Sequence, residues 1–204
     1  MNASTETISR RQLMQQLTAI TLGGTLLPLT GLAETAGSPT PAQGGIYIAP
    51  GQGKQAAIGN MSICFKLDKL QTGHHLGLWE TVIQPGELGA PPHLHQGFDE
   101  LLRVLEGSVH VMTGDEVTEV KAGGWHLRPR GLVHTFWNSG SIPAKTIDMC
   151  LPGGHEAYMT ELATLFDNGH RPKPADFAAL EKKYDIQYRF DKLQEVMTTY
   201  HVHL

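Results

Sequence analysis

Between residues 46 and 152, short runs of β-branched and aromatic residues alternate with turn-forming glycines and prolines. This alternation restricts the possible folds more than any other feature of the chain. The runs cover residues 61–67, 76–84, 101–105, 108–112, 133–137 and 145–151. Turn signals separate them, for example Pro85-Gly86, Glu106-Gly107 and Asn138-Ser139-Gly140. Strands at such short spacing, with no helical period between them, predict an antiparallel β-sandwich or β-barrel.

Toward the C-terminus the apolar period becomes helical. Residues 157–166 and 175–184 form two amphipathic stretches with apolar side chains three and four positions apart, and residues 185–204 allow a third short helix. No internal repeat is present, so the barrel occurs once. We therefore predict a mostly β protein, with one barrel over residues 46–152 and a small C-terminal helical extension over residues 153–204.

The N-terminal segment, residues 1–33, resembles a twin-arginine export signal. Arg10 and Arg11 precede an uncharged stretch that ends in small residues, with candidate cleavage positions near Ala33 and Ala36. Polar residues within this stretch disfavour a permanent membrane span, and a disordered tail is the remaining alternative. We expect export to the periplasm or the cell exterior, with the Pro-, Gly-, Ser- and Thr-rich residues 34–45 as a flexible linker.

Composition limits the partners and the covalent cross-links. The formal net charge is −4 and no stripe of Lys and Arg occurs, which argues against a nucleic-acid partner because such binding depends on clustered basic side chains. The chain has two cysteines, Cys64 and Cys150, both within strand-like runs. They form one disulfide in an oxidising compartment or remain two buried thiols, and the sequence leaves both alternatives open.

Ionisable residues gather in two short stretches of the predicted barrel. Residues i and i+2 of a strand share a face, so His93 and His95 present two imidazoles to one point. Glu100 starts the next strand, and its carboxylate returns toward these imidazoles across a short turn. In the second stretch, Pro129-Arg130-Gly131 sets a tight turn and His134 begins the outgoing strand.

These stretches match the two motifs of the cupin superfamily, HxHx4Ex6G and Gx5PxGx2Hx3N, with 15 residues between them. The matching positions are His93, His95, Glu100, Gly107, Gly123, Pro129, Gly131, His134 and Asn138. The chain thus resembles a cupin. This resemblance implies a jelly-roll barrel in which one divalent transition metal is held by His93, His95, Glu100 and His134. Gly86 lies one position further from His93 than the family's motif often has it, which affects only the incoming loop.

The nature of the donor atoms agrees with a transition metal. Three imidazoles and one carboxylate suit Fe, Mn, Ni, Cu or Co, and the absence of a thiolate argues against a structural zinc site. The alternative is a metal-free polar core, which is unfavourable because convergent ionisable groups in an apolar barrel need compensation. No supporting spacing links the other histidines to this site, and we expect them at the surface or in strand packing: His74, His75, His110, His126, His155, His170, His201 and His203.

Over about residues 58–190 the chain is similar to the single-domain, quercetin-dioxygenase-like cupins. The similarity lies in Gly77-Leu78-Trp79-Glu80, Pro91-Pro92, Asp99-Glu100, Val104-Leu105-Glu106-Gly107 and Pro152-Gly153-Gly154-His155-Glu156. It implies that an enol or flavonol-type substrate reacts with O2 at the metal and that Glu100 is catalytic, accepting the substrate's hydroxyl proton. Phe136 shares a strand face with His134, so it either walls the pocket or packs in the barrel.

Two other classes of function stay open at this point. The same site would serve the decarboxylation of a small acid or the isomerisation of a sugar without O2. The protein would otherwise bind a metal or small molecule without turnover, as a periplasmic carrier or sensor. Cupins commonly pair through sheet edges, so the resemblance also implies a homodimer. The sequence does not define the native metal, the substrate or the cleavage point.

Overall fold

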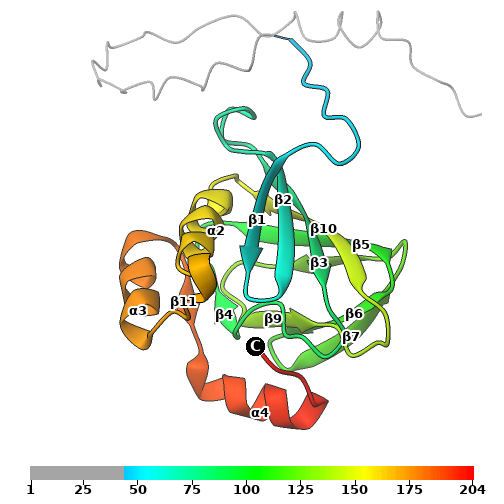
Figure 1. The fold of residues 1–204 in the computed structure, drawn as a ribbon, viewed down its shortest axis with the longest axis vertical. Helices are drawn as coiled ribbons and strands as arrows, with labels where there is room; N and C mark the ends of the chain where they lie inside the picture. The colour runs from blue at the N-terminus through cyan, green and yellow to red at the C-terminus, as the bar shows by residue number, and fades with distance from the viewer. Residues whose placement is uncertain (1–43) are drawn as a thin grey trace, which may run out of the picture. The chain divides into compact units, whose positions relative to one another are not determined.

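Two antiparallel sheets form the body of the computed structural model, which describes residues 44–204 (Figure 1). The six-stranded sheet has the order β1-β2-β3-β10-β5-β8, with bounds Lys54–Ile58, Met61–Leu67, Gly77–Ile83, Ala144–Leu151, Asp99–Glu106 and Trp125–Arg128. The five-stranded sheet has the order β11-β4-β9-β6-β7, with bounds Gln187–Tyr188, His93–Leu94, His134–Trp137, Ser108–Thr113 and Glu116–Lys121. This architecture confirms the predicted mostly β, jelly-roll barrel of the cupin type.

The predicted strands and the observed strands agree best in the middle of the sheets. The six predicted runs are strands β2, β3, β5, β6, β9 and β10, with small differences at their ends. Strands β1, β7 and β8 were not among the predicted runs, and all three lie at sheet edges. Edge strands bury fewer side chains, so their sequences carry a weaker apolar alternation; in β7, for example, only Val120 is buried.

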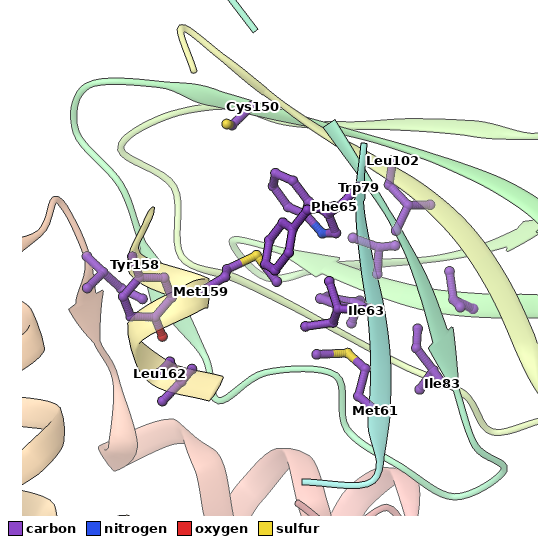
Figure 2. Packing of buried hydrophobic residues seen from close by; sticks show 14 of the residues in the cluster. Met61, Ile63, Phe65, Trp79, Ile83, Leu102, Cys150, Tyr158, Met159 and Leu162 are labelled. Carbon is purple, nitrogen blue, oxygen red and sulfur yellow. The ribbon is translucent and has the colours of Figure 1, made fainter. Parts of the chain in front are cut away.

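Alternating burial along the central strands builds the core. In β3 the side chains of Trp79, Thr81 and Ile83 face inward, and the residues between them are only half buried. Figure 2 shows Ile63 and Phe65 of β2 opposite the side chains that α2 contributes to the same cluster. Full burial of one such side chain stabilises the fold by roughly 1.5–3 kcal/mol, so these contacts hold the helix against the barrel.

The C-terminal part is helical, as predicted, and it also contributes to the smaller sheet. Helices α2, α3 and α4 span His155–Thr164, Pro174–Lys183 and Phe190–Tyr200, and a single 3-10 turn, η1, spans Asp167–Gly169 (Figure 1). Between α3 and α4, strand β11 pairs with β4, so that Tyr188 lies opposite His93. Near the chain end, His203 forms a parallel bridge with Glu87. The extension therefore completes the sheet that carries the histidines.

Several other expectations concern residues 1–45 or the cysteines. The predicted export signal and the linker lie outside the described residues, except for Gly44 and Gly45. Both cysteines are free thiols in the structure, and burial raises the pKa of Cys150 to about 11. Within residues 44–204, no helix has the length and apolar character that a membrane crossing requires.

Candidate metal centre

The four predicted ligands converge inside the barrel from both sheets. His93 on β4 and His134 on β9 are direct cross-strand partners, with ring centroids 4.5 Å apart. His95 follows β4, and Glu100 is the second residue of β5 in the opposite sheet. The candidate ligand atoms of all four residues lie within 4.8 Å of one another, and all four side chains are buried. The structure thus brings together every residue that the two motifs indicated.

Hydrogen bonds to the backbone fix the tautomer of each imidazole. The Nδ1 atom of His93 lies 2.7 Å from the carbonyl oxygen of Pro91, that of His95 2.6 Å from Asp185, and that of His134 3.0 Å from Leu132. A carbonyl oxygen only accepts, so each Nδ1 carries a proton and donates it. In a neutral imidazole the other nitrogen, Nε2, is then left with its lone pair, which is the form that binds a metal.

The Nε2 lone pairs of the histidines and the Glu100 carboxylate converge, and this arrangement is suited to holding a cation. His134 Nε2 lies 3.2 Å from Glu100 Oε2, and with the tautomer above both atoms are acceptors. His95 Nε2 and His134 Nε2 are buried and have no hydrogen-bond partner among the described residues. A further proton on His93 or His95 is unfavourable, because burial holds the pKa of each ring below its usual range. Three nitrogens and one carboxylate oxygen therefore fit a divalent transition metal.

Glu100 is ionised because a buried guanidinium faces it. Burial by itself would raise the pKa of Glu100, but the charge of Arg128 opposes it, and the pKa lies well below its usual range. Arg128 Nη2 lies 3.3 Å from Glu100 Oε2 and 2.7 Å from Asp148 Oδ1. All three side chains are almost fully buried, so Arg128 balances two carboxylates where water does not screen them.

A cavity of about 430 Å³ opens onto this cluster. His93 and Glu100 lie on its wall, so two of the four candidate ligands face the space where a small molecule would bind. Phe136 also lines the cavity and packs in the hydrophobic core, which means that both roles considered for it apply. A volume of this size is in the ordinary range for small-molecule sites.

His155 belongs to the site, and the expectation that it lies at the surface or in strand packing is wrong. It is the first residue of α2, and the packing of this helix on the barrel leaves it only 7% exposed. Its Nε2 atom lies 3.6 Å from Glu100 Oε1, and its ring is 4.7 Å from that of His95, between centroids. Burial is the main cause that lowers the pKa of His155 to about 3, and the neighbouring ring of His95 is the second. The ring of His155 is therefore neutral at physiological pH. No spacing in the sequence connects His155 to the motif residues.

Asp185 is the second residue that the motifs did not indicate. Its carboxylate accepts hydrogen bonds from the backbone N–H groups of Gln96 and Gly97, at 2.9 and 2.6 Å. Its backbone carbonyl accepts the hydrogen bond from His95 described above. The segment between α3 and β11 thus holds the loop that positions His95.

Replacing Asp185 with Ala is expected to weaken metal binding about tenfold, because partners that orient a ligand typically contribute that much to affinity. The loop around Gln96 and Gly97 loses its two side-chain acceptors in this variant. Competition with a chromophoric chelator measures the effect. Asp191→Ala is the matched control, since Asp191 pairs with Arg189 at the surface, away from the candidate metal centre. Equal affinity in the two variants would contradict this role for Asp185.

Known proteins that are similar to this chain share its β-barrel domain. Residues 79–150 match the family described as Cupin_2, cupin domain. Germin-like protein 9-2 of Oryza sativa subsp. japonica is 32% identical over 74 residues, which are 34% of this chain and 35% of that protein. The match thus spans about a third of the length of this curated relative.

Solved structures show the same barrel at low sequence identity. KdgF from Halomonas sp. is 16% identical, with a TM-score of 0.50 over 56% of this chain and 99% of that chain. A predicted oxalate decarboxylase from Thermotoga maritima is 16% identical, with a TM-score of 0.50 over 52% of this chain and 99% of that chain. At this identity the likeness concerns the fold alone. Together with the cupin-domain match over residues 79–150, it supports a cupin-type fold for the barrel of this chain.

Proposed function

We propose that this protein is a metal-dependent cupin enzyme of the dioxygenase type, acting on a planar enol or flavonol-type molecule. The observation that carries the proposal is the cavity that has His93 and Glu100 on its wall. A substrate in this cavity meets the open side of the histidine–carboxylate cluster. The remaining sides of the cluster are closed by strands and by buried side chains.

The walls of the cavity favour a flat, largely apolar substrate. Its aromatic lining residues are Trp79, Phe136, Tyr158, Phe166, Phe177 and Tyr188. Aromatic faces bind planar rings well, whereas a sugar needs a hydrogen-bond partner for most of its hydroxyl groups. This contrast favours an enolic or phenolic ring over a carbohydrate.

A bound transition metal would hold the substrate's oxygen atoms and supply the redox chemistry with O2. His93, His95, His134 and Glu100 would hold this metal. The hydrogen bonds to the three Nδ1 atoms leave each Nε2 free to bind the metal, and the guanidinium of Arg128 keeps Glu100 ionised.

Glu100 is the proposed catalytic base. Its Oε2 atom faces the Arg128 guanidinium at 3.3 Å, which makes this oxygen the less basic one. Its Oε1 atom faces the neutral ring of His155 at 3.6 Å. We therefore propose that Oε1 accepts the hydroxyl proton of the substrate, which leaves an electron-rich enolate for the reaction with O2. Glu100 is only 3% exposed, so little bulk water reaches its carboxylate during this step.

The test is oxygen uptake by protein loaded in turn with Fe, Mn, Ni, Cu or Co and supplied with a panel of flavonols. Uptake with at least one pairing is expected. No uptake with any pairing excludes the dioxygenase. Metal-loaded protein that converts a small acid or a sugar without O2 would instead identify a decarboxylase or an isomerase. Protein that holds a ligand unchanged would identify a binding protein.

Glu100→Gln is expected to lower kcat about 100- to 10,000-fold at saturating metal, because an amide does not accept the proton. Glu106→Gln is the control, since Glu106 lies at the exposed end of the same strand. Oxygen uptake and metal content are measured on both variants. A Glu100→Gln variant that keeps its metal and its full kcat would exclude Glu100 as the base.

We also propose that the protein is exported in its folded state, which rests on the twin-arginine pattern at Arg10 and Arg11. Replacing both arginines with Lys is expected to keep the protein in the cytoplasm. Fractionation of cells that express either form provides the measurement. An unchanged exported fraction would contradict the twin-arginine route.

A further inference from the structure

Two buried tyrosines form a hydroxyl pair on the cavity wall. Tyr158 comes from α2 and Tyr188 from β11, and their hydroxyl groups are hydrogen-bonded to each other. Both rings line the cavity, and their residues are 5% and 9% exposed. Figure 2 shows Tyr158, Met159 and Leu162 on α2, and all three belong to the core cluster. Neither tyrosine belongs to the motifs that indicated the metal centre.

One of the two hydroxyl hydrogens in this pair is not used by the hydrogen bond between the tyrosines. Two phenol groups carry two hydrogens, and the bond between them uses one. No other hydrogen bond to either hydroxyl is present within residues 44–204. Burial raises the pKa of Tyr188 to about 12 and that of Tyr158 well above its usual range, so both phenols stay protonated at physiological pH. The second hydrogen therefore has no protein acceptor in the described part of the chain, although a buried donor normally finds one.

The pair lies close to the candidate metal centre without being part of it. The ring of Tyr158 stacks on that of His155 at 4.8 Å between centroids. The ring of Tyr188 is 6.5 Å from that of His93. A planar molecule that meets His93 and Glu100 at one edge thus extends along a wall that contains the spare hydroxyl donor.

We propose that the Tyr158–Tyr188 hydroxyl pair is a substrate-recognition site that donates one hydrogen bond to a substrate oxygen atom other than those that bind the metal. The inference rests on the proposed function and narrows its substrate class. The favoured ligand is a planar enol or flavonol with an additional hydroxyl or carbonyl oxygen away from its metal-binding edge. A ring system without such an oxygen leaves the buried donor unpaired.

The experiment compares two probes that share the same metal-binding edge. Kaempferol and 3-hydroxyflavone both carry the 3-hydroxyl and 4-carbonyl groups, but kaempferol has further hydroxyl groups on its outer rings. Dissociation constants are measured by calorimetry on the metal-loaded full chain without O2, so that turnover does not interfere. The proteins are the wild type, Tyr158→Phe, Tyr188→Phe, and the variant with both changes.

Each single variant keeps one phenol, which is then free to donate, so both are expected to retain the preference for kaempferol. The double variant has no donor, and its preference is expected to fall about fivefold relative to the wild type, as for the loss of one neutral hydrogen bond. Tyr184→Phe is the control. Its hydroxyl binds Glu161 and it does not line the cavity.

An unchanged kaempferol preference in the double variant overturns the recognition site. So does an equal loss of affinity for both probes, because it indicates that the pair only supports the shape of the cavity. These results leave the dioxygenase proposal intact, since oxygen uptake tests it separately. If neither probe binds to any of the proteins, the flavonol substrate class is excluded and this inference with it.

Discussion

Replacing His95 with Ala is expected to weaken metal binding by at least about 100-fold, which is more than partners outside the ligand set usually contribute. His95 is fully buried, and its Nε2 has no hydrogen-bond partner in the described structure. The variant keeps the fold, but it is less heat-stable when metal is present. A metal at 100 times its dissociation constant stabilises the native state by about 2.7 kcal/mol, and most of this stabilisation is lost. Elemental analysis and thermal unfolding with and without metal measure the two effects.

The control for this change is His110→Ala. His110 lies on β6 and its Nδ1 contacts the Ser139 hydroxyl, so it belongs to no part of the candidate metal centre. It is expected to retain the metal content of the wild type. Stoichiometric metal in the His95→Ala protein would show that the site has been assigned to the wrong residues.

Replacing Arg128 with Met is expected to lower the free energy of unfolding by about 3–5 kcal/mol, because it leaves two buried carboxylates without their shared cation. For a chain of this length, that corresponds to a melting temperature lower by roughly 10 °C. Arg128 is 2% exposed and faces both Glu100 and Asp148. Denaturation in the presence of a chelator measures this effect without a contribution from bound metal.

The pH dependence of the Arg128→Met variant has a definite sign. In the wild type, burial already raises the pKa of Asp148, and only the charge of Arg128 and nearby hydrogen bonds oppose this effect. Without the guanidinium, the folded-state pKa values of Asp148 and Glu100 rise above their unfolded values. The free energy of unfolding of the variant is then highest at low pH, and it falls as the pH rises through these folded-state pKa values. The variant should therefore differ more from the wild type at pH 8 than at pH 5.

The matched control is Arg130→Met. Arg130 also pairs with a carboxylate, that of Asp99 at 2.9 Å, but its side chain is 46% exposed. Exposed pairs contribute less than about 1 kcal/mol, so this variant should unfold close to the wild type. Similar losses in the two variants would show that the burial of Arg128 has no special importance.

Local rules predicted the central strands, and the resemblance to the cupin motifs indicated the candidate ligands. The β3 strand was predictable because its side chains alternate between the core and a half-buried face. His93 and His95 were predicted to share a strand face from their spacing, whereas His134 was indicated by the resemblance to the second cupin motif. The edge strands β1, β7 and β8 escaped the same reasoning, since side chains that remain partly exposed leave a weaker pattern in the sequence.

The amino-acid sequence by itself indicated the barrel, because strand periodicity and turn residues act over a few neighbouring positions, and its resemblance to the two cupin motifs indicated the four candidate ligands. Only the tertiary structure decided what surrounds them. Asp185 bonds to His95 across 90 positions of sequence, and His155 reaches Glu100 from the first turn of a helix. Such contacts depend on how α2 and β11 pack against the barrel. Packing depends on the shape and burial of many side chains at once, and no short spacing encodes it.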